Sequence, residues 1–274
     1  MIGSPRAGVL VAVGWLAGGS LLLACATPLD TDQEQDLGLD AARALRKELD
    51  FVRDPWVVDY VDSLGRQLLA AAGPQPFDFQ FYVVRDPALN AYALPAGYIY
   101  LNTGILLDAA NVSELAGVLA HEIGHVALRH VAENYNRQRN TQLAYETASV
   151  LASVLVGGYA AAGGQLAGQL VVVTYLNQFS REDEQEADAF ALEILPRAGY
   201  DPNGLLTFFE TLQAQSGRAE VPVFLSSHPT TAARIEAAAA SIAAAPLPGD
   251  LQVSDRGRLQ IIQRRIELLG QERG

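Results

Sequence analysis

The hydrophobic positions of the chain change their period from one stretch to the next, and each period predicts a different element. Apolar residues recur at helical spacing from Leu37 to Leu49, which predicts a helix. Asp54 and Pro55 then mark the start of a second helix that runs to about Ala72. Aspartate accepts hydrogen bonds from the free N–H groups of a first turn, and proline has no N–H to leave free there.

The next stretch alternates with a period of two, which is typical of strands. The segment PFDFQFYVV places Phe77, Phe79, Phe81 and Val83 on one face, the pattern of a half-buried strand. LNAYALPAGYIYLN follows as two short extended pieces separated by Pro-Ala-Gly at 95–97. Because proline cannot donate a hydrogen bond to a neighbouring strand, the first piece is predicted to be an edge strand.

Two further helices complete the pattern. Asn111 begins the first of them, with Glu114 placed to close a capping box, and apolar spacing carries it to about Arg137. After the sequence PLPG, an amphipathic helix is expected from about Ser254 to Leu269. These elements predict an α+β protein that is mainly α.

A long uncharged run extends from Thr147 to Ser180. Its length would cross a membrane, but glycine pairs at 157–158 and 163–164 divide it into two pieces that are each too short. The favoured interpretation is an apolar helical hairpin packed on the domain. A hairpin that dips into a membrane or gates substrate, and a true spanning segment, are the alternatives.

The N-terminus has the pattern of a secretory signal: Arg6 is followed by an uncharged apolar run to Ala26. Cys25 ends this run in the sequence LLAC, which resembles the lipobox of bacterial lipoproteins, where the cysteine is acylated. We therefore expect a signal peptide over 1–24, a lipid anchor on Cys25 and a polar tether over 25–36. A plain signal peptide or an uncleaved anchor is the alternative. Alanine at 26 implies, by the same resemblance, the outer membrane.

Composition limits the possible partners. Half of the 274 residues are hydrophobic and 18% are charged, as in a globular protein. The net charge of −12 argues against nucleic acid, whose binding needs a basic face, and against adsorption to an anionic membrane. A single cysteine leaves no disulfide. We expect one domain over 37–245 and a helical extension over 246–274.

Three of the four histidines lie in GVLAHEIGHVALRH, residues 117–130. His121 and His125 are four apart, so on a helix they share a face and can ligate one zinc ion. Glu122 lies beside that face, where it can take a proton from water. On a continuous helix His130 is turned about 140° from His125 and about 180° from His121. It is therefore predicted to pack or hydrogen-bond on the far side of the helix rather than to ligate the metal.

A third ligand is predicted in SREDEQEADAFALEIL, residues 180–195. Glu184 and Asp188 head an otherwise apolar helix face there, and buried carboxylates need a cation or strong donors. Glu184 would ligate zinc, and Asp188 would orient a ligand histidine or assist proton transfer. The remaining glutamates fall on a face suited to solvent: Glu182, Glu186 and Glu193.

HEIGH followed by SREDEQEAD resembles the gluzincin family of HtpX-like, CAAX-prenyl-protease-like and Oma-type zinc endopeptidases. LNAYALPAGYIYLNTGIL at 89–106 is similar to that family's NAFALPGG segment, and SSHPTTAARI at 226–235 to its HPxxxxRI element. The resemblance covers about 33–242 and implies a zincin-like fold. Among members, the chain looks most like short periplasmic lipoprotein peptidases without TPR repeats.

The resemblance implies roles for further residues. The edge strand would pair with an extended substrate along Asn90, Ala91, Tyr92 and Ala93. His228 and Arg234 would face the site, with Arg234 stabilising the oxyanion. His228 would be a catalytic helper or a fourth, inhibitory zinc ligand at rest; a loop histidine that caps the next helix is the plain alternative.

The favoured function is a zinc endopeptidase of the cell envelope that hydrolyses misfolded or unassembled periplasmic and outer-membrane proteins, with outer-membrane assembly machinery as a possible partner. One alternative is a chaperone-like lipoprotein with a structural zinc site, which would have no use for Glu122. The other is a protease of intramembrane or lipid-modified substrates, suggested only by the uncharged run over 147–180.

Overall fold

The computed structural model describes residues 28–140, 179–215, 223–229 and 231–271. The predicted signal peptide, Cys25 and residues 147–178 of the predicted hairpin lie outside the described residues. The helices before the gap are α1 (Thr31–Glu48), α2 (Pro55–Ala72), η1 (Pro95–Gly97), α3 (Thr103–Asp108) and α4 (Val112–Ala127). Those after it are α7 (Arg181–Arg197), α8 (Asn203–Gln215), α9 (Val223–Ser227), α10 (Ala232–Ala244) and α11 (Arg258–Gln271). The strands are β1 (Gln80–Val84), β2 (Ala91–Leu94) and β3 (Tyr98–Asn102).

The three strands form a small mixed sheet in the order β1-β3-β2. β1 runs parallel to β3 and β2 antiparallel to it. Tyr82, Tyr100 and Tyr92 lie at one register position and stack across the strands with ring centroids 5.1 Å apart in each pair. The prediction that the first piece of LNAYALPAGYIYLN is an edge strand is confirmed.

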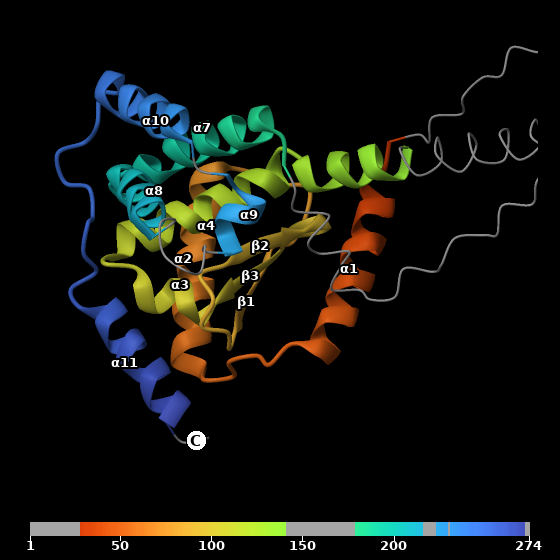
Figure 1. Cartoon of the computed structure of the whole chain (residues 1–274), viewed down its shortest axis with the longest axis horizontal. Coiled ribbons are helices and arrows are strands. Elements are labelled where there is room, and N and C mark those ends of the chain that lie inside the picture. Colours follow the sequence, from red (N-terminus) through yellow and green to blue (C-terminus); the bar gives the residue numbers. More distant parts are fainter. Residues whose placement is uncertain (1–27, 141–178, 216–222, 230, 272–274) are drawn as a thin grey trace, which may run out of the picture.

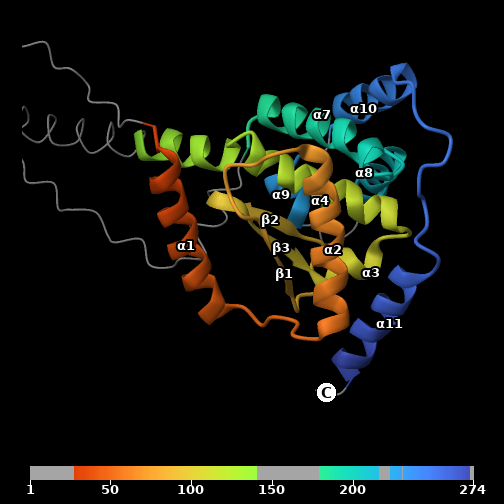
Figure 2. The same ribbon diagram turned by 180° about the vertical axis from the view of Figure 1, so that it is seen from behind.

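α4 is the central helix of the fold. It lies between the sheet and the pair α7 and α8, while α2 packs on β1 and also contacts α4 and α7 (Figures 1 and 2). Its side chains are buried from Val112 to Val126. The crossing with α8 is close, because a Cβ atom on Gly117 would lie 2.9 Å from the backbone of Leu205. The histidine motif is therefore held deep in the fold between two layers.

The start of α4 follows the predicted cap with one difference. Asn111 accepts a hydrogen bond from the backbone N–H of Glu114. The Glu114 carboxylate reaches past Asn111 and accepts from the N–H of Ala110 at 2.9 Å and from the Thr207 hydroxyl at 3.0 Å. The predicted capping box required the Glu114 carboxylate to accept from the backbone N–H of Asn111, and this part of the prediction is wrong. The carboxylate bonds to Ala110 instead and connects α4 to α8 through Thr207.

The end of α4 differs more. A continuous helix to about Arg137 was expected, but α4 ends at Ala127 and Arg129 has φ +63°. Helical structure resumes at His130. The left-handed residue is held by contacts far away in the sequence: Arg129 donates to the buried carboxylate of Glu34 at 2.9 Å and to the carbonyl of Leu29 at 2.8 Å. No glycine or proline marks this break.

The N-terminal boundary was also wrong. α1 begins at Thr31, with Asp30 and Gln33 forming a capping box, so residues 31–36 are helix rather than tether. Glu34 in this first turn is 1% exposed. The first turn of α1 is therefore joined to the rest of the fold by the contact between Glu34 and Arg129.

The C-terminal helix packs on the domain rather than extending from it. α11 begins at Arg258, four residues later than expected, and buries Leu259, Ile262 and Ile266 in the common core. Asp255 accepts from the Tyr60 hydroxyl at 2.7 Å. Among the helices of the described part, none combines the length and apolar composition needed to cross a bilayer.

Candidate metal centre

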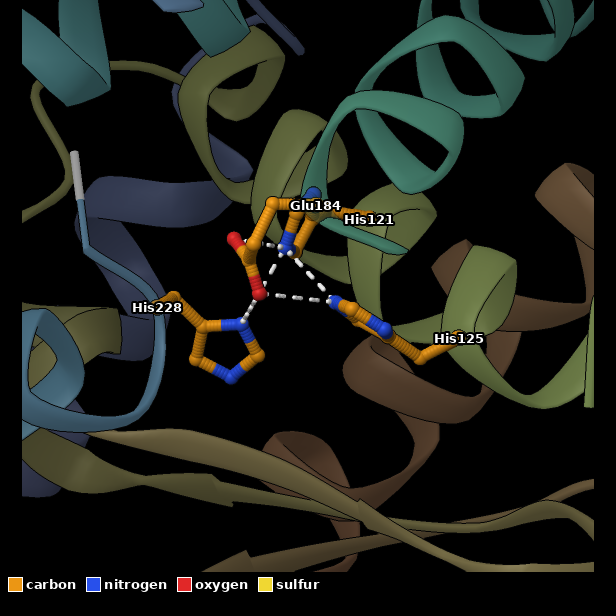
Figure 3. A group of neighbouring side chains, drawn as sticks. All are labelled: His121, His125, Glu184 and His228. Atoms are coloured by element: carbon orange, nitrogen blue, oxygen red, sulfur yellow. Dashed lines mark hydrogen bonds and ion pairs between the residues drawn. The ribbon is translucent and has the colours of Figure 1, made fainter. Parts of the chain in front are cut away.

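Four buried side chains from three parts of the chain converge on one point. His121 and His125 come from α4, Glu184 from the first turn of α7, and His228 from the bend that follows α9. Figure 3 shows these side chains pointing toward one another, with the strands passing beneath them. The three residues predicted as metal ligands are thus brought together, and His228 takes the fourth position of the same group.

The donor atoms are spaced as a tetrahedral zinc site requires. Zinc–ligand bonds of about 2.0–2.1 Å put neighbouring ligand atoms about 3.3–3.4 Å apart. His121 Nε2 lies 3.1 Å from His125 Nε2 and 3.3 Å from His228 Nδ1. Glu184 Oε1 lies 2.9 Å from His228 Nδ1 and 3.4 Å from His125 Nε2. The set of three imidazoles and one carboxylate therefore fits zinc.

Charge also favours a divalent cation. Glu122, Glu184 and Asp188 are buried carboxylates, and Arg234 is the buried guanidinium that pairs with two of them. When all three carboxylates are ionised and the histidines are neutral, as metal ligands are, Arg234 leaves two negative charges uncompensated among the described residues. Buried charge without a partner is costly, so a doubly charged ion is the natural complement.

Glu122 makes no hydrogen bond to the described residues. It is fully buried, and neither carboxylate oxygen has a hydrogen-bond partner within the described ranges. The nearest group is His228, whose Nε2 lies 3.5 Å from Glu122 Oε1. Burial raises the pKa of Glu122. A carboxylate that is kept free and made more basic beside the donor cluster is suited to accept a proton.

Asp188 lies beside the first histidine. Its Oδ1 lies 3.0 Å from His121 Nδ1, which leaves His121 Nε2 directed at the other donors. Burial alone raises the pKa of Asp188, but hydrogen bonds from His121 and Arg234 outweigh it and lower that pKa. The same acidic neighbours, Asp188 and Glu184, outweigh burial at His121 and raise its pKa to about 9.

Arg234 is committed to these carboxylates. Its guanidinium donates to Asp188 from Nε and from Nη2, each at 2.7 Å, contacts Glu184, and donates to the Pro229 carbonyl at 3.1 Å. It is 3% exposed and lies over the Phe209 ring. This does not fit the expected role of Arg234 as a cation facing the reacting carbonyl. Here it positions Glu184, Asp188 and the segment that carries His228.

His130 is outside the donor group but is not on the far side of the helix. Its Nδ1 lies 3.1 Å from His125 Nδ1 and its Nε2 lies 3.2 Å from the carboxylate of Glu186. The prediction that it points away was wrong because it assumed an unbroken helix, and the turn at Arg129 brings the ring back. Phe179 stacks on His125 with ring centroids 3.7 Å apart, a contact that no sequence pattern indicated.

The predicted substrate-binding residues lie on and just before the edge strand. Ala91 and Ala93 are fully buried, and Tyr92 is nearly so. The carbonyl of Asn90 accepts from the N–H of Asn102, and its side-chain oxygen has no partner among the described residues. The carbonyl of the preceding Leu89 accepts from the N–H of Phe224 in α9 at 3.0 Å, which ties this strand to the segment of His228.

The model for peptidase family M48 matches residues 55–242, a span that includes all of these site residues. The chain belongs to this family. M48 peptidases are metallopeptidases that use zinc, in agreement with the donor set. The M48 match and the helical architecture around a small mixed sheet confirm the expected α+β, mainly α fold.

Several M48 relatives are similar over most of the chain. The beta-barrel assembly-enhancing protease of Escherichia coli O157:H7 is 34% identical over 215 residues, which are 76% of this chain and 43% of that protein. The mitochondrial metalloendopeptidase OMA1 of Schizosaccharomyces pombe is 33% identical over 177 residues, 64% of this chain and 50% of that protein. Metalloprotease LoiP of Escherichia coli K12 is 33% identical over 163 residues, 59% and 61% respectively. The chain spans less than half of the first of these.

Proposed function

We propose that this protein is a zinc endopeptidase that hydrolyses peptide bonds in unfolded or unassembled proteins of the bacterial cell envelope. The observation that carries the proposal is the buried Glu122 next to the four-donor cluster, whose carboxylate accepts no hydrogen bond from any described residue. A purely structural zinc site needs four ligands and gains nothing from a free carboxylate beside them.

The residues divide the chemistry among them. His121, His125 and Glu184 hold the metal. Zinc, when bound, supplies Lewis acidity that polarises the scissile carbonyl and makes water more acidic. Glu122 takes the proton from the attacking water on its carboxylate and passes it toward the leaving amine. Asp188 fixes the orientation of His121, since its contact on Nδ1 keeps the Nε2 lone pair directed into the site.

Substrate is proposed to bind as an extended segment along β2, beside Asn90 and Ala91–Ala93. β2 is the outer strand of the described sheet, and an edge strand can take up a further strand through backbone hydrogen bonds. Such binding requires an unfolded or flexible segment, since a folded protein does not offer an isolated extended strand. This selects misfolded or unassembled clients by conformation.

His228 is proposed to be a latch on this site. Its Nδ1 is within the spacing of a fourth ligand, and it is fully buried. Because α9 is bonded to Leu89 at the start of the substrate strand, substrate entering there would disturb the segment that holds His228. His228→Ala is then expected to raise basal cleavage of an unstructured protein such as casein. Loss of activity would instead make His228 a catalytic helper.

The cellular setting is proposed from the sequence and the relatives. A lipid anchor on Cys25 would hold the protein at the outer membrane, facing the periplasm. A relative named as a beta-barrel assembly-enhancing protease favours unassembled outer-membrane proteins as clients and the assembly machinery as a partner.

The test is Glu122→Gln, which keeps the size of the side chain but cannot take a proton. We expect cleavage of casein to fall by about 100-fold or more, in line with the loss of a general base, while zinc content stays at one ion per chain. If the variant clears a client as well as the wild type, the chaperone-like alternative is favoured. If cleavage needs a lipid-modified or membrane-embedded substrate, the intramembrane alternative is favoured.

A further inference from the structure

His125 has a different outer environment from its partner histidine. On His121, Nδ1 faces the Asp188 carboxylate directly at 3.0 Å. On His125, Nδ1 faces another imidazole nitrogen, His130 Nδ1, at 3.1 Å. An imidazole can either donate or accept at that atom, so the contact leaves the orientation and tautomer of His125 undecided until the next partner is considered.

The next partner is a carboxylate. His130 Nε2 lies 3.2 Å from Glu186 Oε2, and an ionised carboxylate only accepts. A neutral His130 that donates from Nε2 to this carboxylate presents the lone pair of Nδ1 to His125. His125 in turn donates from Nδ1, which leaves the lone pair of its Nε2 free, in the position that lies 3.1 Å from His121 Nε2. In this arrangement of protons His125 can bind zinc through Nε2.

The fold holds His130 and His125 in this row of Glu186, His130 and His125. Arg129, in its left-handed conformation, turns the chain so that His130 comes back beside His125. The ring of Phe179 covers one face of His125 at an interplanar angle of 18°. His130 is 2% exposed, so water does not compete for its nitrogen atoms. Glu186, with 66% of its side chain exposed, is the weaker end of the row.

We propose that His130, with Glu186 behind it, is the positioning residue for His125: it fixes the tautomer and ring orientation in which His125 ligates zinc. This inference rests on the proposed zinc function. Asp188 contacts His121 directly, whereas Glu186 acts on His125 through His130. The proposal thus gives a role to His130, the third histidine of the motif.

The test compares two substitutions of similar size in the full chain. His130→Leu removes the acceptor, whereas His130→Asn restores an oxygen near the position of Nδ1. The primary measurement is zinc affinity by competition with a chromogenic chelator, which does not depend on peptidase activity. Casein cleavage (kcat and KM separately) and the melting temperature of the zinc-free protein are measured alongside.

We expect His130→Leu to weaken zinc binding by about 10- to 100-fold, as the loss of such an outer contact does in other zinc sites. His130→Asn should stay within about threefold of the wild type, since its amide oxygen is an acceptor. Glu186→Ala should weaken zinc binding less than His130→Leu does. Added to His130→Leu, it should cause no further loss of zinc affinity, because the two residues act as one unit. Glu182→Ala, an exposed glutamate on the same helix, is the matched control and should have no effect.

Two results would overturn the proposal. One is unchanged zinc affinity in His130→Leu. The other is an equal loss in the Leu and Asn variants together with a lower melting temperature of the zinc-free protein, which would make His130 a packing residue. Wild-type protein that binds zinc but cleaves no casein would refute the endopeptidase function. The zinc affinities of His130→Leu and His130→Asn would still decide whether His130 positions His125. Wild-type protein that takes up no zinc would overturn both.

Discussion

Replacing Arg234 with leucine should destabilise the metal-free protein far more than the zinc-loaded one. The guanidinium is buried between Asp188 and Glu184, whose side chains are 8% and 2% exposed. Without it, both carboxylates stay buried with no cation of that kind to offset them. Removing one partner of a buried ion pair costs about 3–5 kcal/mol. In the zinc-loaded protein the ion still balances the charge of Glu184, so only the unpaired charge of Asp188 lowers the stability.

The measurement is thermal unfolding followed by circular dichroism, with and without a zinc chelator. For a domain of this size, about 3–5 kcal/mol corresponds to a fall in melting temperature of roughly 6–20 °C, and the chelated sample should show the larger fall. Arg234→Lys keeps the charge but cannot make the two-pronged contact with Asp188, so an intermediate loss is expected.

The second variant tests the cause. Adding Asp188→Asn to Arg234→Leu removes one of the orphaned charges and should restore about 1–3 kcal/mol, because an uncharged buried amide costs less than a buried carboxylate. The reasoning is refuted if Arg234→Leu costs under about 1 kcal/mol. It is equally refuted if the double variant is no more stable than the single one, since the loss would then come from packing against Phe209.

Three further predictions concern stability. The hydrogen bond from Arg265 lowers the pKa of Asp54, so its contribution is complete above the unfolded pKa of about 3.9 and is lost as the pH falls through the lower folded value. The advantage of wild type over Asp54→Asn, about 0.5–1 kcal/mol for this partly exposed pair, should therefore shrink steadily in urea titrations repeated at falling pH below about 3.9. Gly117→Val should cost about 1–3 kcal/mol in urea unfolding, since its Cβ would meet the Leu205 backbone, while an exposed glycine such as Gly249 should tolerate the same change. Chelation should lower stability by about 2.7 kcal/mol relative to free zinc at 100 times Kd, and calorimetry that shows no dependence on zinc would count against a bound ion.

The local signals in the sequence were reliable where a single element decides the outcome. Asp54-Pro55 begins α2 and Asn111 begins α4, as predicted, because a cap depends on its own first turn. The helical period of His121 and His125 puts both on one face, and the apolar stripe of α7 puts Glu184 and Asp188 on another. These are properties of a helix in isolation, so they can be worked out from spacing alone.

The sequence failed where a distant residue decides. The end of α4 depends on Arg129 reaching Glu34 in α1 and the carbonyl of Leu29, and no local residue announces that break. From this one turn follow the true place of His130 and its contact with His125. Likewise, the pairing of Arg234 with Asp188 depends on how α10 packs on α7, and this pairing took Arg234 away from the expected oxyanion role.

The sequence by itself therefore singled out the residues to which we assign the chemistry: the pair His121 and His125, the proposed base Glu122, and Glu184 on a second helix. Periodicity fixes which side chains share a face, and burying a carboxylate demands a cation. Only the tertiary structure decided where their neighbours lie: His228 completes the group of four donors, and His130 comes within 3.1 Å of His125. Both depend on loops and on a left-handed turn whose conformation is set by contacts across the fold rather than by their own sequence.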